Sequence, residues 1–220
     1  MTNTKTRILD TAERLFAAHG FEAASLRAIT AEAGVNLAAV NYHFRSKEIL
    51  IEAVITRRLG PINRRRLEML DACEAEAGKR PPELEKIMEA FFAPVFEAHP
   101  HEMGSFLPLM GRMLMVPEQF QRQIFDKHFA AIVRRFEAAL DLALPKLPPV
   151  ERRWRNIFSI GAMTHTLLLS RILPALSQGL CDLSDGKAVT RWIVTFVSAG
   201  LRAPATQMPQ TVRKGRAAGD

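Results

Sequence analysis

The sequence predicts an all-α protein of about nine helices. Apolar residues recur every three or four positions through long segments, which is the period of a helix with one buried face. Glycine and proline separate these segments, and no run alternates apolar and polar residues between hairpin turns. With 48% hydrophobic residues, the 220-residue chain has ample material for a packed core.

The first predicted helix covers residues 5–19 and buries one side. Ile8, Ala12, Leu15 and Phe16 form its apolar stripe, and charged residues occupy much of the remaining surface. We expect this helix to support the pair of helices that follows it.

Two short helices joined by a tight turn are predicted between Ser25 and Lys47. Ser25 can cap the first of them, and Gly34 lies where a left-handed residue would end it. Asn36 can cap the second, which is expected over residues 37–43.

The second helix of this pair has an inward and an outward side. Helical spacing turns Val40 and Phe44 inward. The residues left for an outside partner are Ala38, Ala39, Asn41 and Tyr42. A helix, a turn containing glycine and a second helix form the arrangement with which many proteins read DNA.

A longer helix is predicted from Lys47, because Ser46 can cap it and apolar residues follow at helical spacing. Gly60 and Pro61 interrupt the pattern, so we expect a kink or a break there. The three arginines at 64–66 form either a solvated face or a nucleic-acid contact, and their distance from the helix pair favours the solvated face.

The remaining helices are predicted from their apolar stripes and from the prolines between them. They cover residues 83–98, residues 117–144, a segment from about 150, and residues 184–201. Residues 203–220 are rich in Pro, Ala and Gly, and we expect a flexible basic tail there.

Residues 103–115 hold four of the nine methionines of the chain, with leucines, a phenylalanine and two glycines. Methionine adapts to irregular shapes, so this segment could line a cavity for an apolar ligand. Methionine and leucine at helical spacing also form ordinary core, and the residues alone favour that interpretation.

Three short blocks, AGVN, AAVNYHF and SKEIL, occur in this order, and Phe16, Gly20 and Phe21 precede them. Over residues 5–53 this pattern resembles the DNA-binding domain of the TetR family of bacterial repressors. Thr30 and Asn41 depart from the commonest residues of the family at their positions. The resemblance implies a DNA-binding domain at 1–52 and a ligand-binding and dimerisation domain at 53–202, followed by the tail at 203–220.

The resemblance implies a ligand-responsive regulator, most simply a repressor. It would bind a palindromic operator in double-stranded DNA as a homodimer and be released by a small apolar effector. The run LAAVNYHFRSKEIL, with Leu59, Gly60 and Pro61 beyond it, is similar to a subgroup that senses long-chain fatty acids or their CoA thioesters.

Candidate site residues follow from the helix faces and from the resemblance. Those expected to contact DNA are Ser25, Arg27, Leu37, Ala38, Ala39, Asn41, Tyr42, His43 and Lys47, with Ala38, Ala39 and Asn41 reading bases and the polar flanks holding phosphates. Those expected to bind the effector are Phe91, Phe106, Met110, Met113, Phe125, Phe129 and His165.

The expected dimer interface consists of Phe158, Gly161, His165, Trp192 and Phe196. Packing of these residues within their own subunit is an equal alternative. For His165 a hydrogen-bonded position in the core is the plainer expectation.

The net charge of +7 favours a polyanionic partner, either nucleic acid or an anionic membrane surface. Cys73 and Cys181 form no metal or disulfide pattern, His99 and His101 are expected to be loop residues, and no nucleotide-binding or hydrolase motif is present. We therefore expect no metal, no cofactor and no enzyme activity, no membrane partner, and a cytoplasmic location. The alternative function is a helical adaptor that binds protein and has no sequence-specific affinity for DNA.

Overall fold

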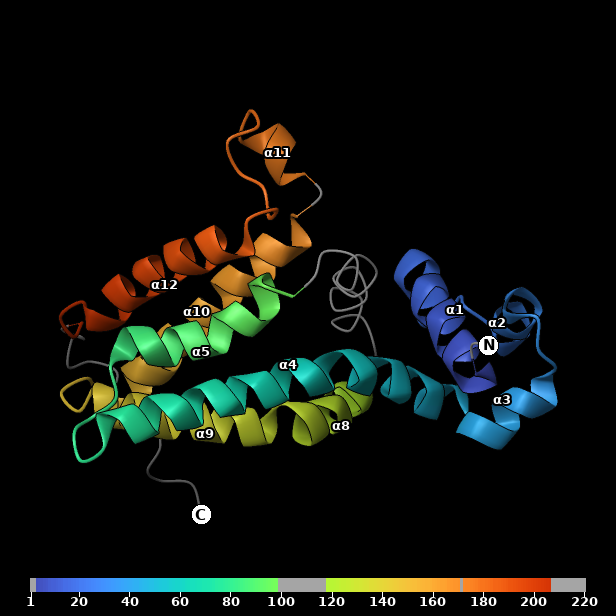
Figure 1. Ribbon diagram of the computed structural model, residues 1–220, viewed down its shortest axis with the longest axis horizontal. Helices are drawn as coiled ribbons and strands as arrows, with labels where there is room; N and C mark the ends of the chain where they lie inside the picture. Colours follow the sequence, from blue (N-terminus) through green and yellow to red (C-terminus); the bar gives the residue numbers. More distant parts are fainter. Residues whose placement is uncertain (1–2, 99–117, 171, 207–220) are drawn as a thin grey trace, which may run out of the picture.

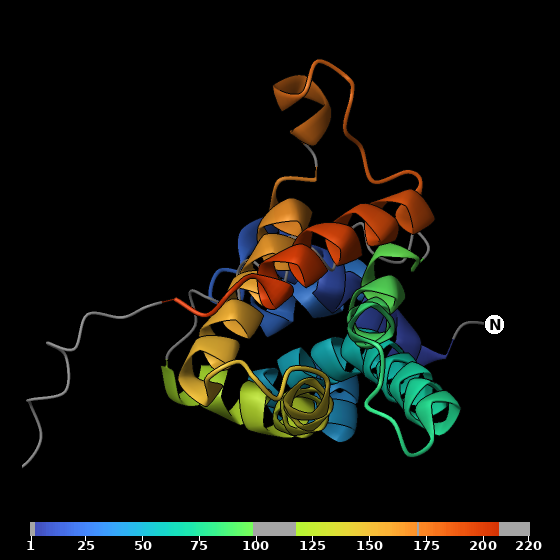
Figure 2. The same cartoon turned by 90° about the vertical axis from the view of Figure 1, so that its left-hand side faces the viewer.

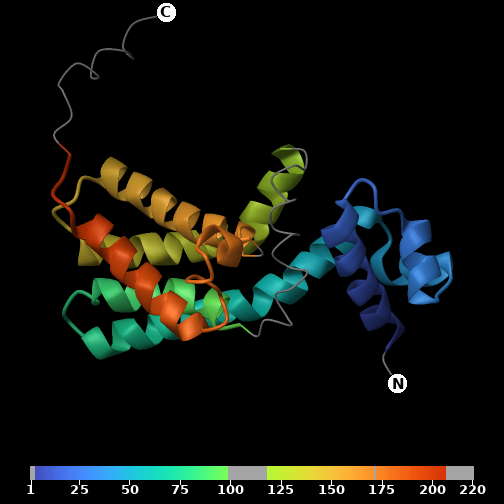
Figure 3. The same ribbon diagram turned by 90° about the horizontal axis from the view of Figure 1, so that it is seen from above.

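The computed structural model describes residues 3–98, 118–170 and 172–206 and confirms the all-α prediction (Figure 1). These residues form ten helices and no strand. The helices are α1 (Thr4–His19), α2 (Leu26–Ala33), α3 (Leu37–Phe44), α4 (Lys47–Ala77), α5 (Leu84–Phe96), α8 (Glu118–His128), α9 (Ala130–Ala143), α10 (Pro149–Leu168), α11 (Leu173–Leu176) and α12 (Gly186–Arg202). The group α1–α3 lies at one end, and α4 runs from it into the larger helical body (Figures 1 and 3).

Helix α4 is continuous over 31 residues, although Gly60 and Pro61 lie inside it. A proline removes one backbone hydrogen bond from a helix interior, and the burial of Leu59 and Ile62 on either side compensates for that loss. Of the kink or break expected at Gly60 and Pro61, the break is absent. As a consequence, the expected domain boundary at 52/53 falls within one helix that belongs to both parts of the protein.

The single helix predicted over residues 117–144 is wrong. The chain forms α8 and α9, separated at Phe129. The side-chain amide of Asn63 on α4 donates a hydrogen bond of 2.7 Å to the carbonyl of His128 at the end of α8. Figure 3 shows α8 turning away from the line of α9. The apolar residues of α8 and those of α9 each keep helical spacing, so the spacing in the sequence does not reveal the break between the two helices.

Helix α5 lies in the centre of the body, against α4 and α12. Most of its apolar side chains are buried, and those of Ile87 and Phe92 are buried completely. Gly186, the first residue of α12, lies so close to the end of α5 that an added Cβ would be 2.1 Å from the Phe96 carbonyl oxygen. The contact between these two helices therefore depends on a residue without a side chain.

The segment between α10 and α12 projects from the body and contains the four-residue helix α11, which was not predicted (Figures 1 and 2).

The start of the expected tail is bound to helix α10 by hydrogen bonds. Arg155 donates hydrogen bonds to the carbonyls of Ala203 and Pro204, and Glu151 accepts them from Thr206.

Candidate nucleic-acid interface and ligand cavity

The predicted capping groups of the helix pair are all confirmed. The Ser25 hydroxyl accepts from the backbone N–H of the third residue of α2, and Asn36 does the same for α3 over 2.8 Å. Gly34 adopts the left-handed conformation at φ 61° and ψ 41°. Ser46 caps α4 in the same way as Ser25 caps α2. Each of these capping groups acts on residues that are no more than three positions away, so all of them can be predicted from the local sequence.

Helix α3 buries one side and presents the other to solvent. Val40 and Phe44 are buried, as predicted. The exposed residues of α3 are Leu37, Ala38, Asn41 and Tyr42, whereas Ala39 and His43 are half-buried. Ala39 packs partly against the core, so it offers less surface to a DNA base than Ala38 or Asn41 does.

The residues expected to hold phosphates include some from the start of α2 and the first residue of α4. Ser25 and Arg27 are exposed, although the Ser25 hydroxyl is already occupied as a cap. The Lys47 ammonium donates to the Glu22 carbonyl over 3.0 Å. Arg45 was not predicted to contact DNA, although it is exposed directly after α3. It adopts φ 59° in a tight turn that is closed by a hydrogen bond from the Ser46 N–H to the Phe44 carbonyl. Its positive charge and its place next to the second helix of the pair could have indicated a phosphate contact.

Helix α1 supports the pair through side chains, as predicted. The Arg7 guanidinium donates to the carbonyls of Ala33 and Gly34, the second over 3.2 Å, and so satisfies the end of α2. From the other direction, Arg57 of α4 donates to Glu13 of α1 over 2.6 Å. The helix pair is thus tied through α1 to the long helix α4.

A cavity of about 760 Å³ lies between α4, α5, α8, α9 and α10. Three of the predicted effector residues line it, Phe91, Phe125 and Phe129. The other lining residues were missed, and most of them are apolar: Leu59, Ile62, Arg66, Val95, Glu118, Gln121, Arg122, Ile124, Asp126, Ile132, Val133, Ile160, Met163, Thr164, Leu167 and Leu168. A cavity of this size and lining is typical of sites that enclose a small organic ligand.

The other four predicted effector residues fall into two groups. Phe106, Met110 and Met113 lie outside the described residues, as do His99 and His101, which were expected to be loop residues. His165 is not among the residues that line the cavity, and its side chain is exposed on α10 rather than buried in the core. The exposed position is compatible with its second predicted place, in a dimer interface.

Arg66 corrects the expectation of a solvated basic face. Arg64 and Arg65 are exposed as expected, but Arg66 is 3% exposed and lines the cavity. Its guanidinium lies 4.1 Å from the centre of the Phe91 ring, and its Nε donates to the Phe91 carbonyl over 2.9 Å. Burial lowers the pKa of Arg66 to about 10, so the side chain still carries its charge at neutral pH.

The residues expected to form the dimer interface are exposed. Phe158 on α10 is 64% exposed, and Trp192 and Phe196 on α12 are 66% and 71% exposed. Gly161 is exposed beside Phe158 on the next turn of α10. Large aromatic side chains that are this exposed are uncommon on the surface of a monomer and are typical of protein–protein contacts.

No described helix has both the length and the apolar composition needed to cross a bilayer. Within the same residues, no three potential metal ligands come together.

A capped helix pair with an exposed second helix, joined by one long helix to a body with a cavity, defines a helix-turn-helix DNA-binding transcriptional regulator. The family described as "Bacterial regulatory proteins, tetR family" matches residues 8–54. "Tetracyclin repressor-like, C-terminal domain" matches residues 89–200, just over half of the chain. The chain belongs to the TetR family.

Individual relatives agree with this assignment. The HTH-type transcriptional regulator UidR of Escherichia coli K12 is 42% identical over 52 residues, which are 24% of this chain and 26% of UidR. This chain thus spans about a quarter of the length of that relative.

Solved structures resemble the whole fold. A TetR-family transcriptional regulator from Bordetella parapertussis 12822 has a TM-score of 0.67 at 14% identity, covering 90% of this chain and 95% of its own. The fatty acid degradation regulator FadR from Bacillus halodurans has a TM-score of 0.61 at 14% identity, covering 92% and 98%. At these identities the likeness concerns the fold alone.

Proposed function

We propose that this regulator is a repressor that binds a palindromic operator as a homodimer and is released by a small apolar effector. The observation that carries the proposal is the course of α4. Its first turn follows α3 directly, and further along the same helix Leu59, Ile62 and Arg66 line the cavity. One rigid element therefore touches both the DNA-reading part and the ligand-binding part.

DNA recognition is assigned to the exposed side of α3, placed in the major groove. Asn41 can pair with adenine through two hydrogen bonds, and the methyl group of Ala38 can contact a thymine methyl. Tyr42, His43, Lys47 and Arg27 lie at the edges, where they would hold phosphates and fix the position of the helix.

The dimer is assigned to the exposed aromatic residues of α10 and α12. One helix-turn-helix contacts few base pairs, and a twofold dimer reads two half-sites about one DNA turn apart. Phe158, Trp192 and Phe196 would then become buried against the same residues of a second copy.

The effector would act on α4 through α8. Asn63 of α4 binds the carbonyl of His128 at the end of α8, and the Thr56 hydroxyl of α4 lies 3.4 Å from the His128 imidazole. Lys127 forms an ion pair with Glu52, nearer the start of α4. A ligand between α8 and α4 would alter these contacts, and the resulting motion of α4 would change the separation of the two α3 helices.

The chemistry of the cavity supports an effector with an acyl chain. Its lining is rich in phenylalanine, leucine and isoleucine, and it would shield such a chain from water. The structural neighbour from Bacillus halodurans is a fatty acid degradation regulator, in line with this class of ligand.

Sequencing of the genomic DNA that the purified protein retains would test the proposal. We expect a small set of fragments that share a palindrome, with binding lost on addition of an acyl compound. Failure to retain any fragment at low salt would contradict the proposal and favour the protein-binding adaptor.

A further inference from the structure

Among the residues that the structure describes, the cavity has one buried end that carries a charge and one more exposed end. Arg66 marks the buried end. At the other end Phe125 and Leu168 are partly exposed, and the exposed ion pair of Arg122 and Glu118 lies at the edge. A ligand in this cavity would therefore meet a cation at its inner end and apolar side chains along most of its length.

The partners of Arg66 are all neutral. Besides the Phe91 carbonyl, its Nη1 donates to the Asn63 side chain over 3.1 Å, and its Nη2 lies 3.8 Å from the Met163 sulfur, a weak acceptor. A guanidinium has five N–H groups, and these contacts use three of them. Among the residues that the structure describes, no carboxylate forms an ion pair with Arg66, and burial is the only influence on its pKa.

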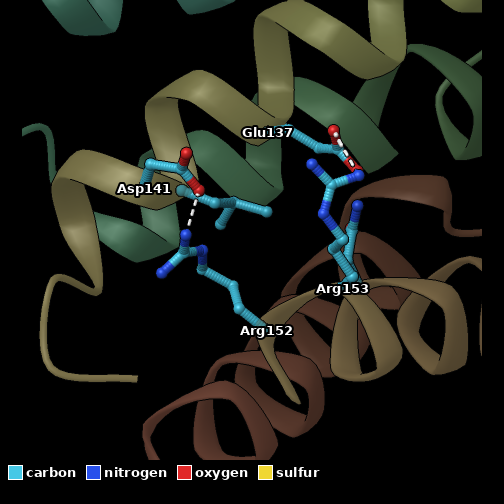
Figure 4. Close-up of a pocket in the computed structure, with 6 residues that line it drawn as sticks. Glu137, Asp141, Arg152 and Arg153 are labelled. Atoms are coloured by element: carbon cyan, nitrogen blue, oxygen red, sulfur yellow. Dashed lines mark hydrogen bonds and ion pairs between the residues drawn. The ribbon is translucent and has the colours of Figure 1, made fainter. Parts of the chain in front are cut away.

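Other poorly exposed arginines of the body are paired with acids. Arg152, with a side chain 12% exposed, lies 2.5 Å from Asp141, and Figure 4 shows the two pointing toward each other between α9 and α10. Arg155, 14% exposed, lies 2.6 Å from Glu151. Arg66 is more buried than either. A buried charge without a countercharge costs several kcal/mol, on the order of the penalty known for single ions in protein interiors.

We infer that Arg66 receives the free carboxylate of an amphipathic ligand, whose apolar chain extends from Arg66 toward α8 and the more exposed end of the cavity. The inference rests on the proposed function, because it assumes that the cavity holds an effector. A carboxylate can accept two parallel hydrogen bonds from a guanidinium, and it supplies a countercharge that none of the described residues gives Arg66.

This orientation selects the free acid over its derivatives. An alcohol or a methyl ester offers no charge to Arg66. A CoA thioester has a neutral carbonyl in place of the carboxylate, and its bulky phosphorylated part cannot occupy the buried end. The free acid, rather than its thioester, is therefore the expected effector.

Bound acid would also reach the contacts that link the cavity to α8. Asn63 joins Arg66 to the carbonyl of His128, through one hydrogen bond on each side. A carboxylate bound to the two unused N–H groups of Arg66 would place a negative charge beside the Asn63 oxygen and weaken the hydrogen bond that this oxygen accepts from Arg66. The Asn63 amide, which holds the end of α8, would then be held less firmly.

Isothermal titration of the full-length, DNA-free protein tests the inference with four probes: dodecanoic acid, dodecanol, methyl dodecanoate and dodecanoyl-CoA. We expect wild type to bind the acid at least about tenfold more tightly than the other three, since hydrogen bonds to charged groups are the stronger ones. In Arg66→Met, acid and alcohol should bind with equal affinity. Arg66→Lys should restore part of the preference.

Arg65→Met is the matched control, because Arg65 is the exposed neighbour on the same helix and its removal should leave the preference unchanged. Urea unfolding of each variant establishes that it is folded. Four results would overturn the inference. Wild type could bind acid and alcohol with equal affinity, bind the thioester more tightly than the acid, or bind none of the probes. Alternatively, the preference for the acid could survive in Arg66→Met. Retention of genomic DNA is measured on the same samples. It tests the proposed function separately from the role of Arg66 in ligand binding.

Discussion

Arg57 of α4 donates a hydrogen bond of 2.6 Å to Glu13 of α1, and Glu13 is 2% exposed. Arg58 donates to the same carboxylate over 2.9 Å. Burial lowers the pKa of Arg57, and its hydrogen bonds to Glu13 and Asp10 outweigh that effect and raise it. Arg58 lies only about 6 Å along the helix axis from Ile62, which lines the cavity. The helix that can sense a ligand is thus held to α1, at the DNA-binding end, by one buried carboxylate and two partly buried arginines.

Glu13→Gln should weaken this fastening. The variant leaves two partly buried arginines without their shared countercharge, and we expect a loss of about 2–4 kcal/mol in the free energy of unfolding, measured in urea. Glu32→Gln is the control, because Glu32 pairs with Arg14 at an exposed site and should cost less than about 1 kcal/mol. If the two substitutions lowered the free energy of unfolding equally, the burial of Glu13 would add nothing to the strength of its ion pairs.

Asn41→Ala should change which DNA sequences the protein prefers. The exposed amide of Asn41 is assigned to a base, so its loss should reduce discrimination by about 1–3 kcal/mol at one position of the half-site. The measurement is a gel shift with operators substituted one base pair at a time. Arg27→Ala, which removes an expected phosphate contact, should weaken binding to all of these operators alike. Unchanged relative affinities in Asn41→Ala would refute its assignment to base reading.

Replacement of Trp192 by aspartate should dissociate the dimer. The side chain is exposed in the single chain but would be buried between two copies, where a charge is costly. Light scattering after size exclusion should give the mass of a dimer for wild type and of a monomer for Trp192→Asp. Leu142→Glu changes a similarly exposed apolar residue on α9 and should remain dimeric. A monomeric wild type at micromolar concentration would exclude this interface.

Stability should fall in mild acid because of His128. Burial lowers the pKa of His128, Glu52 opposes this effect and Lys127 adds to it, so the folded pKa lies below the ordinary value of 6.5. The unfolded chain then takes up the proton first. The contribution of His128 to stability is full above about pH 6.5 and is lost as the pH falls from there toward the folded pKa.

Urea unfolding at about pH 7.5 and about pH 5.5 would measure this dependence. His128→Gln keeps a polar side chain near Thr56 but cannot be protonated, so it should lose less stability over this interval than wild type does. Equal losses in the two proteins would mean that His128 does not contribute.

Gly186→Ala should force α12 away from α5. The added Cβ would lie 2.1 Å from the Phe96 carbonyl oxygen, and backbone atoms cannot give way cheaply. We expect a loss of about 1–3 kcal/mol in thermal or urea unfolding. Gly200→Ala lies in the same helix with nothing within 4 Å, so it should be neutral or slightly stabilising. A neutral Gly186→Ala would mean that the two helices can separate without cost.

The sequence predicted those features that depend on neighbouring residues. Ser25, Gly34, Asn36 and Ser46 act within three positions of themselves, and all of them were located correctly. The family blocks were equally local, and they identified the helix-turn-helix. The inward position of Val40 also followed from spacing alone.

Features that depend on distant packing were missed. At the break at Phe129, the His128 carbonyl accepts a hydrogen bond from Asn63, which lies 65 residues earlier in the chain. The burial of Arg66 depends on Phe91 and Met163 from two other helices, and its charge had suggested a solvated face. His165 was expected in an apolar environment because its sequence neighbours are apolar, yet its own side of α10 faces solvent.

The coupling between the cavity and α3 is tested most directly by measuring effector affinity twice, with free protein and with protein saturated by its operator. Thermodynamic linkage requires that operator weakens effector binding by the same factor by which effector weakens operator binding. We predict a reduction of about 5- to 150-fold, the usual range of coupling between two sites. The same effector affinity with and without operator would contradict a ligand-released repressor.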